Sequence, residues 1–403
     1  MKNLMKILSI ITMVGLVTMI SCKDDDPSPL ELSAVTANDI DLNGATAPNT
    51  VPSDAVIKVT FSTNVDATSA TAANITLTRN FDNVVVPTTI STTDNVVTIT
   101  PTTKLYSGAL YILSLNAGLV STEGVVFTPI TRSFSTAGTF APAGAVAYFN
   151  FESNANDQAG SNNPAASDVI DITYVDGRNS ASGKAASFNG TTSIIEVPNA
   201  PTLATTADFT LSVWIKPDSA AHHGGNFVIG AGGYNGFEFE INKNDGKMAA
   251  QYATGATTSA SQDLWLDGKG NTGFSGWTFS KDLTGSGGFA AIVQQKWSHF
   301  VFTYEASTKI GTIYLNGEKV KTQDFDLYSA PLNAATGLKF NAVTGVGQKM
   351  ALGFYSDRST TAYDWATYTN KDANHFKGLM DDVHIYHQVI PASMITLMYN
   401  SGK

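Results

Sequence analysis

The sequence predicts an all-β protein made of two sandwich domains in series. Short segments in which apolar and polar residues alternate recur along the chain, and turn residues separate them. The segment 297–320 (WSHFVFTYEASTKIGTIYLNGEKV) contains two such strand patterns followed by an Asn-Gly pair. Only 14% of the residues are charged, while Thr, Ser, Asn and Gly are abundant, a composition typical of extracellular β-proteins.

The first strand pattern of this segment has two apolar or β-branched faces. Phe300, Phe302 and Tyr304 alternate with Val and Thr, which favours a position between two packed layers. The Asn316-Gly317 pair predicts a tight hairpin turn, because both residues readily adopt positive φ. We therefore expect this hairpin at the centre of the C-terminal sandwich.

The first 21 residues have the pattern of a secretory signal peptide. Lys2 and Lys6 precede an apolar run that is short for a membrane span. Cys22, the single cysteine of the chain, follows directly, and the four residues that it ends resemble the lipobox of bacterial lipoproteins. Met19 departs from the usual Leu of that motif. The resemblance implies acyl chains on Cys22 and a membrane anchor; the alternative is a secreted protein with an incidental cysteine.

Residues 22–29 are expected to form the acylated start of the mature chain and a tether. Lys23 and the three Asp residues after it resemble the surface-export signal of Bacteroidetes lipoproteins. That resemblance implies a lipid-anchored location at the outer membrane, facing the medium. Neighbouring surface proteins of glycan uptake are expected as further partners. The other interpretation of the charge run is a solvated tether, which Pro27-Ser28-Pro29 would continue as a stiff spacer.

Residues 30–137 contain enough short strand patterns for an immunoglobulin-like sandwich without its cysteine pair. The order of VTFS, TITP, LYSGALY and FST resembles the bacterial Ig-like family. The segment has no His, no Cys and no clustered carboxylates, so we expect a spacer domain. Residues 138–144, rich in Ala, Gly and Pro, are the predicted linker.

Residues 145–403 carry five ordered motifs that resemble the LamG-like, or concanavalin A-like, jelly-roll family. These motifs are AVAYFNFE at 145–152, KAASFNGTTSIIEVP at 184–198, DFTLSVWIKP at 208–217, the hairpin segment 297–320, and FKGLMDDVHIYHQVIPASMITLMYN at 376–400. The resemblance implies a jelly-roll sandwich. It does not select a function, because this fold hosts lectins, adhesion modules and glycosidases.

Two Gly-rich excursions from this sandwich hold the candidate carbohydrate-binding residues. Trp265 and Trp277 lie within 254–295, and Tyr363 and Trp365 lie within 354–376. A flat ring receives the C–H face of a sugar, while polar neighbours bind its hydroxyls. The alternative for any single ring is that it packs its own loop onto the body. We expect at least one exposed platform and therefore a glycan or polysaccharide partner.

The jelly-roll resemblance also implies one structural calcium ion. In this family the ion is held by the loop after the first strand and by the start of the last strand. The matching candidates here are Glu152, Asp157, Asp381 and Asp382, since calcium prefers several oxygen ligands. The alternative is that these acids are solvated loop residues or turn caps.

The sequence predicts a binding protein and no enzyme. The nearest match to a glycosidase carboxylate motif is Glu238-Phe239-Glu240, but Asn242 stands where a further acid is expected, so we expect an exposed strand edge. The net charge of −10, without a basic stripe, argues against a nucleic-acid partner. The predicted function is glycan or polysaccharide capture by a cell-surface lipoprotein; the alternatives are an adhesin or structural protein that binds a protein partner, and a divergent glycoside hydrolase.

Overall fold

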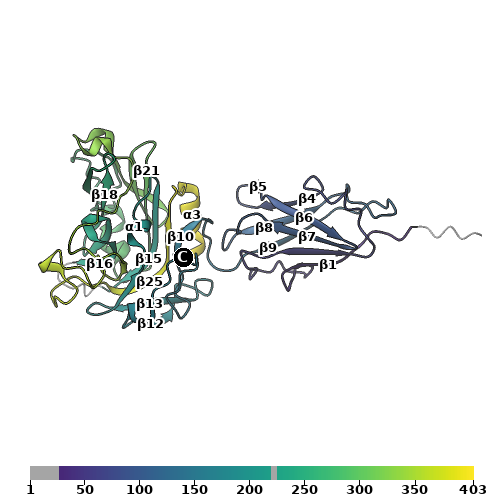
Figure 1. Cartoon of the computed structure of the whole chain (residues 1–403), viewed down its shortest axis with the longest axis horizontal. Coiled ribbons are helices and arrows are strands. Elements are labelled where there is room, and N and C mark those ends of the chain that lie inside the picture. The colour runs from purple at the N-terminus through teal and green to yellow at the C-terminus, as the bar shows by residue number, and fades with distance from the viewer. Residues whose placement is uncertain (1–26, 219–224) are drawn as a thin grey trace, which may run out of the picture.

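The computed structural model describes residues 27–218 and 225–403, and it contains two β-sandwiches side by side (Figure 1). The predicted signal peptide and Cys22 lie outside the described residues. No helix within the described ranges is long and apolar enough to cross a bilayer. The all-β fold class predicted from the sequence is confirmed.

The N-terminal sandwich consists of a five-stranded and a four-stranded sheet. Its strands are β1 (Leu32–Ala37), β2 (Ile40–Asp41), β3 (Ile57–Phe61), β4 (Ile75–Arg79), β5 (Val84–Val85), β6 (Thr88–Thr93), β7 (Val96–Pro101), β8 (Leu110–Leu115) and β9 (Ile130–Ser135). The sheet orders are β2-β1-β3-β7-β6 and β5-β4-β8-β9. In β3, Ile57, Val59 and Phe61 are buried and their neighbours are not, as the period of a strand requires.

The C-terminal sandwich consists of a nine-stranded and a seven-stranded sheet. The strands of the larger sheet are β10 (Ala145–Phe149), β12 (Thr173–Asp176), β13 (Lys184–Asn189), β15 (Phe209–Pro217), β20 (Trp277–Ser280), β21 (Ser298–Glu305), β22 (Ile310–Leu315), β23 (Glu318–Asp324) and β25 (Lys377–Tyr386). They follow the order β12-β13-β25-β15-β21-β22-β23-β20, and β10 pairs with β25.

The strands of the smaller sheet are β11 (Val169–Ile170), β14 (Ile194–Val197), β16 (Gly225–Ala231), β17 (Phe237–Asn242), β18 (Gly246–Ala253), β19 (Ser259–Leu266) and β24 (Met350–Leu352). They follow the order β11-β14-β24-β16-β17-β18-β19. The described part of the domain also contains three α-helices: α1 (Ala200–Leu203), α2 (Gly288–Val293) and α3 (Ala392–Gly402).

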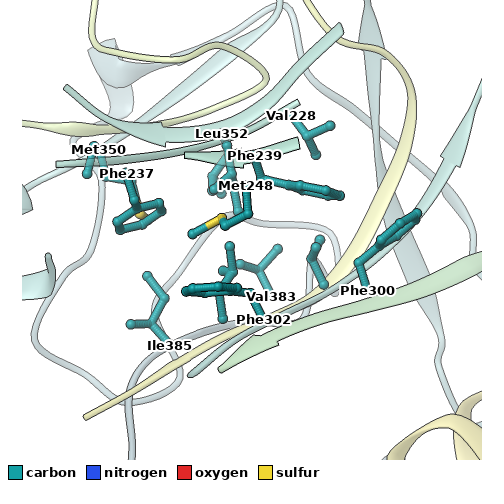
Figure 2. Packing of buried hydrophobic residues seen from close by; sticks show 14 of the residues in the cluster. Val228, Phe237, Phe239, Met248, Phe300, Phe302, Met350, Leu352, Val383 and Ile385 are labelled. Atoms are coloured by element: carbon teal, nitrogen blue, oxygen red, sulfur yellow. The ribbon is translucent and has the colours of Figure 1, made fainter. Parts of the chain in front are cut away.

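The core lies between these two sheets, and Figure 2 shows side chains from both layers pointing toward one another. Phe300 and Phe302 of β21 contribute to one layer, and Phe237 and Phe239 of β17 contribute to the other. The rings of Phe239 and Phe300 meet at a centroid distance of 5.0 Å. Burial of such rings provides the main apolar driving force for the sandwich.

The predicted central hairpin is present, with β21 between β15 and β22 and with β22 paired to β23. Asn316 and Gly317 both have positive φ, 53° and 79°, as a tight two-residue turn demands. The outer face of β21 is also covered. Val301 belongs to a buried cluster with Ile395 and Met398, so the second layer at this point is the helix α3.

Candidate functional site

Polar and charged side chains lie close together on the outer face of the seven-stranded sheet. Along β17, Phe237, Phe239 and Ile241 point into the core, so Glu238 and Glu240 point outward. The strand register places Glu240 opposite Lys247 of β18, and Lys247 opposite Trp265 of β19. Three neighbouring strands therefore bring acids, an amine and an indole to one surface.

Lys247 is the centre of this group. Its Nζ lies 3.0 Å from Oε1 of Glu238 and 3.1 Å from Oε2 of Glu240, and it donates a hydrogen bond of 2.8 Å to the hydroxyl of Tyr234. The same ammonium lies 5.3 Å from the ring centroid of Trp265, within cation–π range. These five residues, Tyr234, Glu238, Glu240, Lys247 and Trp265, are the Lys247 cluster.

Glu238 is buried, and the expectation of an exposed strand edge at this position is therefore wrong. Only 3% of Glu238 is exposed. Burial raises the pKa of its carboxyl to about 7, although the charge and hydrogen bond of Lys247 act in the opposite direction. The carboxylate of Glu238 is thus poised between its two protonation states near neutral pH.

The cause of this burial is the excursion 354–376, which folds onto the same outer face. A Cβ placed on Gly230 of β16 would lie 2.0 Å from the carbonyl oxygen of Tyr355, so the excursion packs directly against the strand backbone. At Gly233 a Cβ would lie 2.9 Å from the Tyr355 ring and 3.2 Å from Oε2 of Glu238. The ring of Tyr355 therefore lies beside the carboxylate and shields it from water.

The excursion 354–376 also carries two of the predicted carbohydrate-binding residues, Tyr363 and Trp365. The ring of Tyr363 lies 6.0 Å from that of Tyr355 and 6.2 Å from that of Trp365. The amide of Asn235 donates a hydrogen bond of 3.1 Å to the Tyr363 hydroxyl, which fixes the ring. Trp365 is 62% exposed. Trp265, Tyr363 and Trp365 thus share one outer face, with Lys247 and Glu240 between the two indoles.

Trp277 lies elsewhere, on the edge strand β20 of the nine-stranded sheet. Its ring is 3.6 Å from Nζ of Lys321 and 4.4 Å from the ring of Phe274. Lys321 in turn donates hydrogen bonds to the Asn271 carbonyl (2.6 Å) and to Oγ of Ser280 (3.1 Å). These contacts hold the chain around Trp277 to its own sheet edge, so Trp277 does not join the other three residues.

The four predicted calcium ligands do not converge on a common point. Oδ1 and Oδ2 of Asp157 accept hydrogen bonds from backbone N–H groups, among them those of Tyr148 (2.8 Å) and Asn162 (2.9 Å). The carboxylate of Glu152 accepts the backbone N–H of Lys184 at 3.2 Å. Both acids therefore act as loop caps in this structure.

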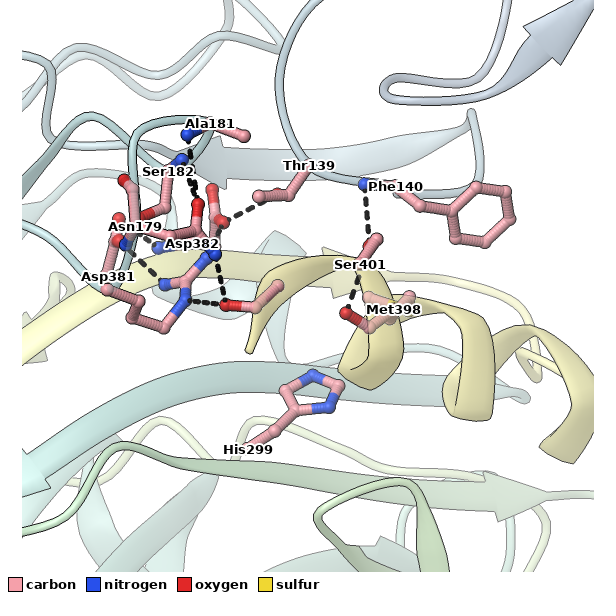
Figure 3. A network of polar contacts seen from close by, with 12 residues as sticks. Thr139, Phe140, Asn179, Ala181, Ser182, His299, Asp381, Asp382, Met398 and Ser401 are labelled. Carbon is pink, nitrogen blue, oxygen red and sulfur yellow. Dashed lines mark hydrogen bonds and ion pairs between the residues drawn. The ribbon is translucent and has the colours of Figure 1, made fainter.

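Asp381 and Asp382 are engaged by a buried arginine. Nη1 of Arg178 lies 2.6 Å from Oδ2 of Asp381, and Nη2 lies 2.5 Å from Oδ2 of Asp382 (Figure 3). Although burial works against ionisation, Arg178 holds the pKa of Asp382 below its usual range. In this arrangement the four acids do not fit a calcium ion, and no group of three or more His, Cys, Asp or Glu in the described ranges could hold a metal. The calcium ion stays a prediction.

Two residues of importance were missed by sequence reasoning, Lys247 and Arg178. Lys247 had a usable signal, since a hairpin turn at Asn242–Asp245 places it opposite Glu240. Arg178 had none, because its partner Asp381 is 203 residues away in the sequence.

Comparison with known families identifies both sandwiches. The model of the family described as "Concanavalin A-like lectin/glucanases superfamily" matches residues 189–396, which is more than half of the chain. The model of the bacterial Ig-like domain matches residues 40–136. No curated protein matches the sequence.

Several solved structures resemble the chain. The binding domain of Paraclostridial Mosquitocidal Protein 1 matches with a TM-score of 0.44 and 18% identity over 64% of this chain and 52% of that one. Domain 4 of AbnA, an extracellular GH43 arabinanase from Geobacillus stearothermophilus in complex with arabinotriose, matches with a TM-score of 0.38 and 20% identity over 64% of this chain and all of that domain.

The ligand-binding domain of botulinum neurotoxin serotype D, in complex with N-acetylneuraminic acid, matches with a TM-score of 0.41 and 12% identity over 64% of this chain and 50% of that one. The chain spans about half the length of the mosquitocidal and neurotoxin structures.

Proposed function

The chain belongs to the concanavalin A-like lectin/glucanase superfamily, and from this premise we propose that it captures a glycan or polysaccharide on the outer face of its seven-stranded sheet. The observation that carries the proposal is the shared face of Trp265, Tyr363 and Trp365. A pyranose stacks its C–H face on an indole and directs its hydroxyls at neighbouring polar groups. Glu240 lies between the two indoles and is only half-buried, so it can accept such hydroxyls.

The cellular part of the proposal concerns the anchor. We propose that Cys22 carries the lipid and that the protein is a cell-surface lipoprotein of the outer membrane. The support is the sequence: a signal-peptide pattern ends at the single cysteine, and Lys and three Asp residues follow it. In this proposal the Ig-like domain separates the binding face from the membrane, and neighbouring surface proteins receive the captured glycan.

Replacing both Trp265 and Trp365 by Ala is expected to abolish glycan retention without unfolding the domain. Each ring that stacks on a sugar contributes on the order of 1 kcal/mol, so loss of two lowers affinity by about tenfold or more. Retention is measured by affinity electrophoresis in gels that contain xylan, arabinan, laminarin, mannan or soluble starch.

Trp277→Ala is the matched control, because it also removes an indole but from a different sheet edge. It should leave retention unchanged. Equal retention by the double variant and the unmodified protein, on a polysaccharide that the unmodified protein binds, would contradict the proposal.

One observation favours glycoside hydrolysis as a second candidate function. Glu238 and Glu240 share a strand face, and burial raises the pKa of Glu238 to about 7, which is suited to a general acid. Lys247, however, lies within 3.1 Å of both carboxylates and occupies the space between them.

We therefore expect no release of reducing ends when the same polysaccharides are incubated with the protein. Lys247 pairs with both acids, which keeps a substrate oxygen from lying between them. Release that disappears in Glu238→Gln but persists in Glu318→Gln, a change at an exposed surface glutamate, would establish the hydrolase instead.

A further inference from the structure

The segment 138–144, predicted as a linker, is bound to both sandwiches. Oγ1 of Thr139 donates a hydrogen bond of 2.8 Å to Oδ2 of Asp382, and the N–H of Phe140 donates one of 3.0 Å to Oγ of Ser401 on α3 (Figure 3). The ring of Phe140 packs edge-on against Phe81 of the N-terminal sandwich at 5.1 Å. One short segment therefore fixes the N-terminal sandwich against the outer face of the nine-stranded sheet.

A cleft of about 630 Å³ lies at this junction. Residues of both sandwiches line the cleft. Most residues of the segment 138–144 also belong to the lining. The side chains that matter below are Ser53, Asp54 and Lys104 from the N-terminal sandwich and Tyr148, Asn150 and Glu152 from the C-terminal sandwich. This volume is typical of sites that enclose a small ligand.

The cleft contains a rigid aromatic surface. Tyr148 of β10 stacks on His384 of β25 with a centroid distance of 4.0 Å and an interplanar angle of 12°. Its hydroxyl donates a hydrogen bond of 3.0 Å to Oδ1 of Asp382, whose other oxygen binds Arg178. The ring is thus held on one side and at its hydroxyl. Since it remains half-buried and lines the cleft, it offers a flat apolar patch to a ligand.

Asn150, a residue of the cleft lining, has a side-chain acceptor that lacks a donor in the described ranges. Oδ1 of Asn150 is buried and has no hydrogen-bond partner among the described residues. Asn150 lines the cleft, so a rotation of its amide toward the cleft would let a ligand hydroxyl donate to this unsatisfied acceptor. His384, of which 3% is exposed, likewise has a buried Nε2 without a partner in the described part of the chain, and its ring lines the cleft.

The charges of the lining favour a neutral ligand. Asp54 and Glu152 are acidic, Lys104 is basic, and Asp382 is already paired with Arg178. No excess of basic groups is present to bind an anion. Serine, asparagine and glutamine side chains make up most of the remaining polar lining, namely Ser53, Ser107, Ser180, Ser182, Asn150 and Gln158.

We propose that this interdomain cleft is a second binding site, for a neutral polyhydroxylated ligand such as a single sugar unit. The aromatic patch would receive its C–H face, and the amide of Asn150, turned toward the cleft, would accept one of its hydroxyls. The site lies on the outer face of the nine-stranded sheet, whereas the Lys247 cluster lies on the outer face of the other sheet. The two sites are therefore separate and can be tested independently.

The test is saturation-transfer NMR on the chain from Pro27 to Lys403, with free glucose, galactose, xylose and N-acetylglucosamine as probes. Ser53→Trp should fill the cleft from the N-terminal side and reduce the transfer by about tenfold or more. Asn150→Ala should reduce it by roughly five- to tenfold through loss of one hydrogen bond. The matched control is Ser91→Trp on the exposed surface of β6, outside the cleft, which should leave the transfer intact.

The outcomes separate the two sites. Transfer that survives in the Trp265→Ala, Trp365→Ala double variant and is lost in Ser53→Trp and Asn150→Ala supports the cleft, whatever becomes of polysaccharide retention. Transfer that is lost in the double tryptophan variant alone, transfer unaffected by both cleft variants, or no transfer from any of the four sugars would overturn it. The unfolding midpoint of Ser53→Trp shows whether this variant folds. If it does not, Asn150→Ala alone decides between the outcomes.

Discussion

Replacing Arg178 by Met will lower the free energy of unfolding of the C-terminal sandwich by about 3–5 kcal/mol, the usual cost of leaving buried charges unpaired. The arginine side chain is 1% exposed, and it bonds to Asp381 and Asp382 at 2.6 and 2.5 Å. Its Nε also donates a hydrogen bond of 2.8 Å to the carbonyl of Gly402, at the end of α3. The substitution therefore removes the partner of two carboxylates and one helix carbonyl at once.

Urea denaturation followed by tryptophan fluorescence measures this loss, because the guanidinium lies 4.4 Å from the ring of Trp214. Lys243→Met is the control: this lysine is an exposed cation of the same C-terminal sandwich, and we expect a change within about 0.5 kcal/mol. Adding Asp382→Asn to Arg178→Met should recover part of the stability, since one buried charge is removed. A loss as small as that of the control would show that the two carboxylates are not buried ions.

A second large effect concerns pH, because two histidines of the C-terminal sandwich are buried in their neutral form. His299 is fully buried, and burial, aided by the nearby Arg178, lowers its pKa from 6.5 to about 3. Burial likewise lowers the pKa of His384 to about 4, although Asp382 opposes the shift. Below pH 6.5 the two histidines bind protons in the unfolded chain but stay neutral in the folded chain. Their contribution to the free energy of unfolding therefore falls as pH falls.

The expected slope is about 1.4 kcal/mol per pH unit for each histidine below pH 6.5, which amounts to about 4 kcal/mol for both when the pH is lowered from 7 to 5. The carboxyl of Glu238 acts in the opposite sense: burial raises its pKa to about 7, so it favours the folded state as pH falls. The total pH profile therefore mixes opposing contributions.

The histidine contribution is isolated by comparison with the double variant His299→Gln, His384→Gln. The difference in free energy of unfolding between the natural protein and this variant should shrink by about 4 kcal/mol when the pH is lowered from 7 to 5. Parallel stability curves for the two proteins across this range would contradict the buried neutral state of both rings. Thr308→Ala, at an exposed position, gives the baseline of an unrelated substitution.

The sequence was sufficient for the architecture because strand period and turn chemistry are local. The alternation around Phe300 and Phe302 predicted a strand with two buried faces, and Asn316-Gly317 predicted the turn between β22 and β23; the structure has both. The same patterns predicted the two sandwiches, which the family matches confirm.

The candidate site was only partly predictable because it depends on contacts between distant segments. The chemistry of Trp and Tyr in Gly-rich excursions pointed to Trp265, Tyr363 and Trp365, but nothing local distinguished them from Trp277. The burial of Glu238 comes from Tyr355, which folds over it from the excursion 354–376. A strand pattern read alone assigns alternate residues to core and solvent, and it contains no information about a loop that later covers the solvent side.

The attachment of Thr139 and Phe140 to both sandwiches has a consequence for the geometry of capture. In the proposed function, two sandwiches that move as one body would present the indoles of Trp265 and Trp365 at a constant inclination to the N-terminal end of the protein. Once one copy of the protein holds a long polymer, binding of the same polymer by a second copy would then cost less rotational entropy. Neighbouring copies with the same inclination would hold the polymer in a common direction.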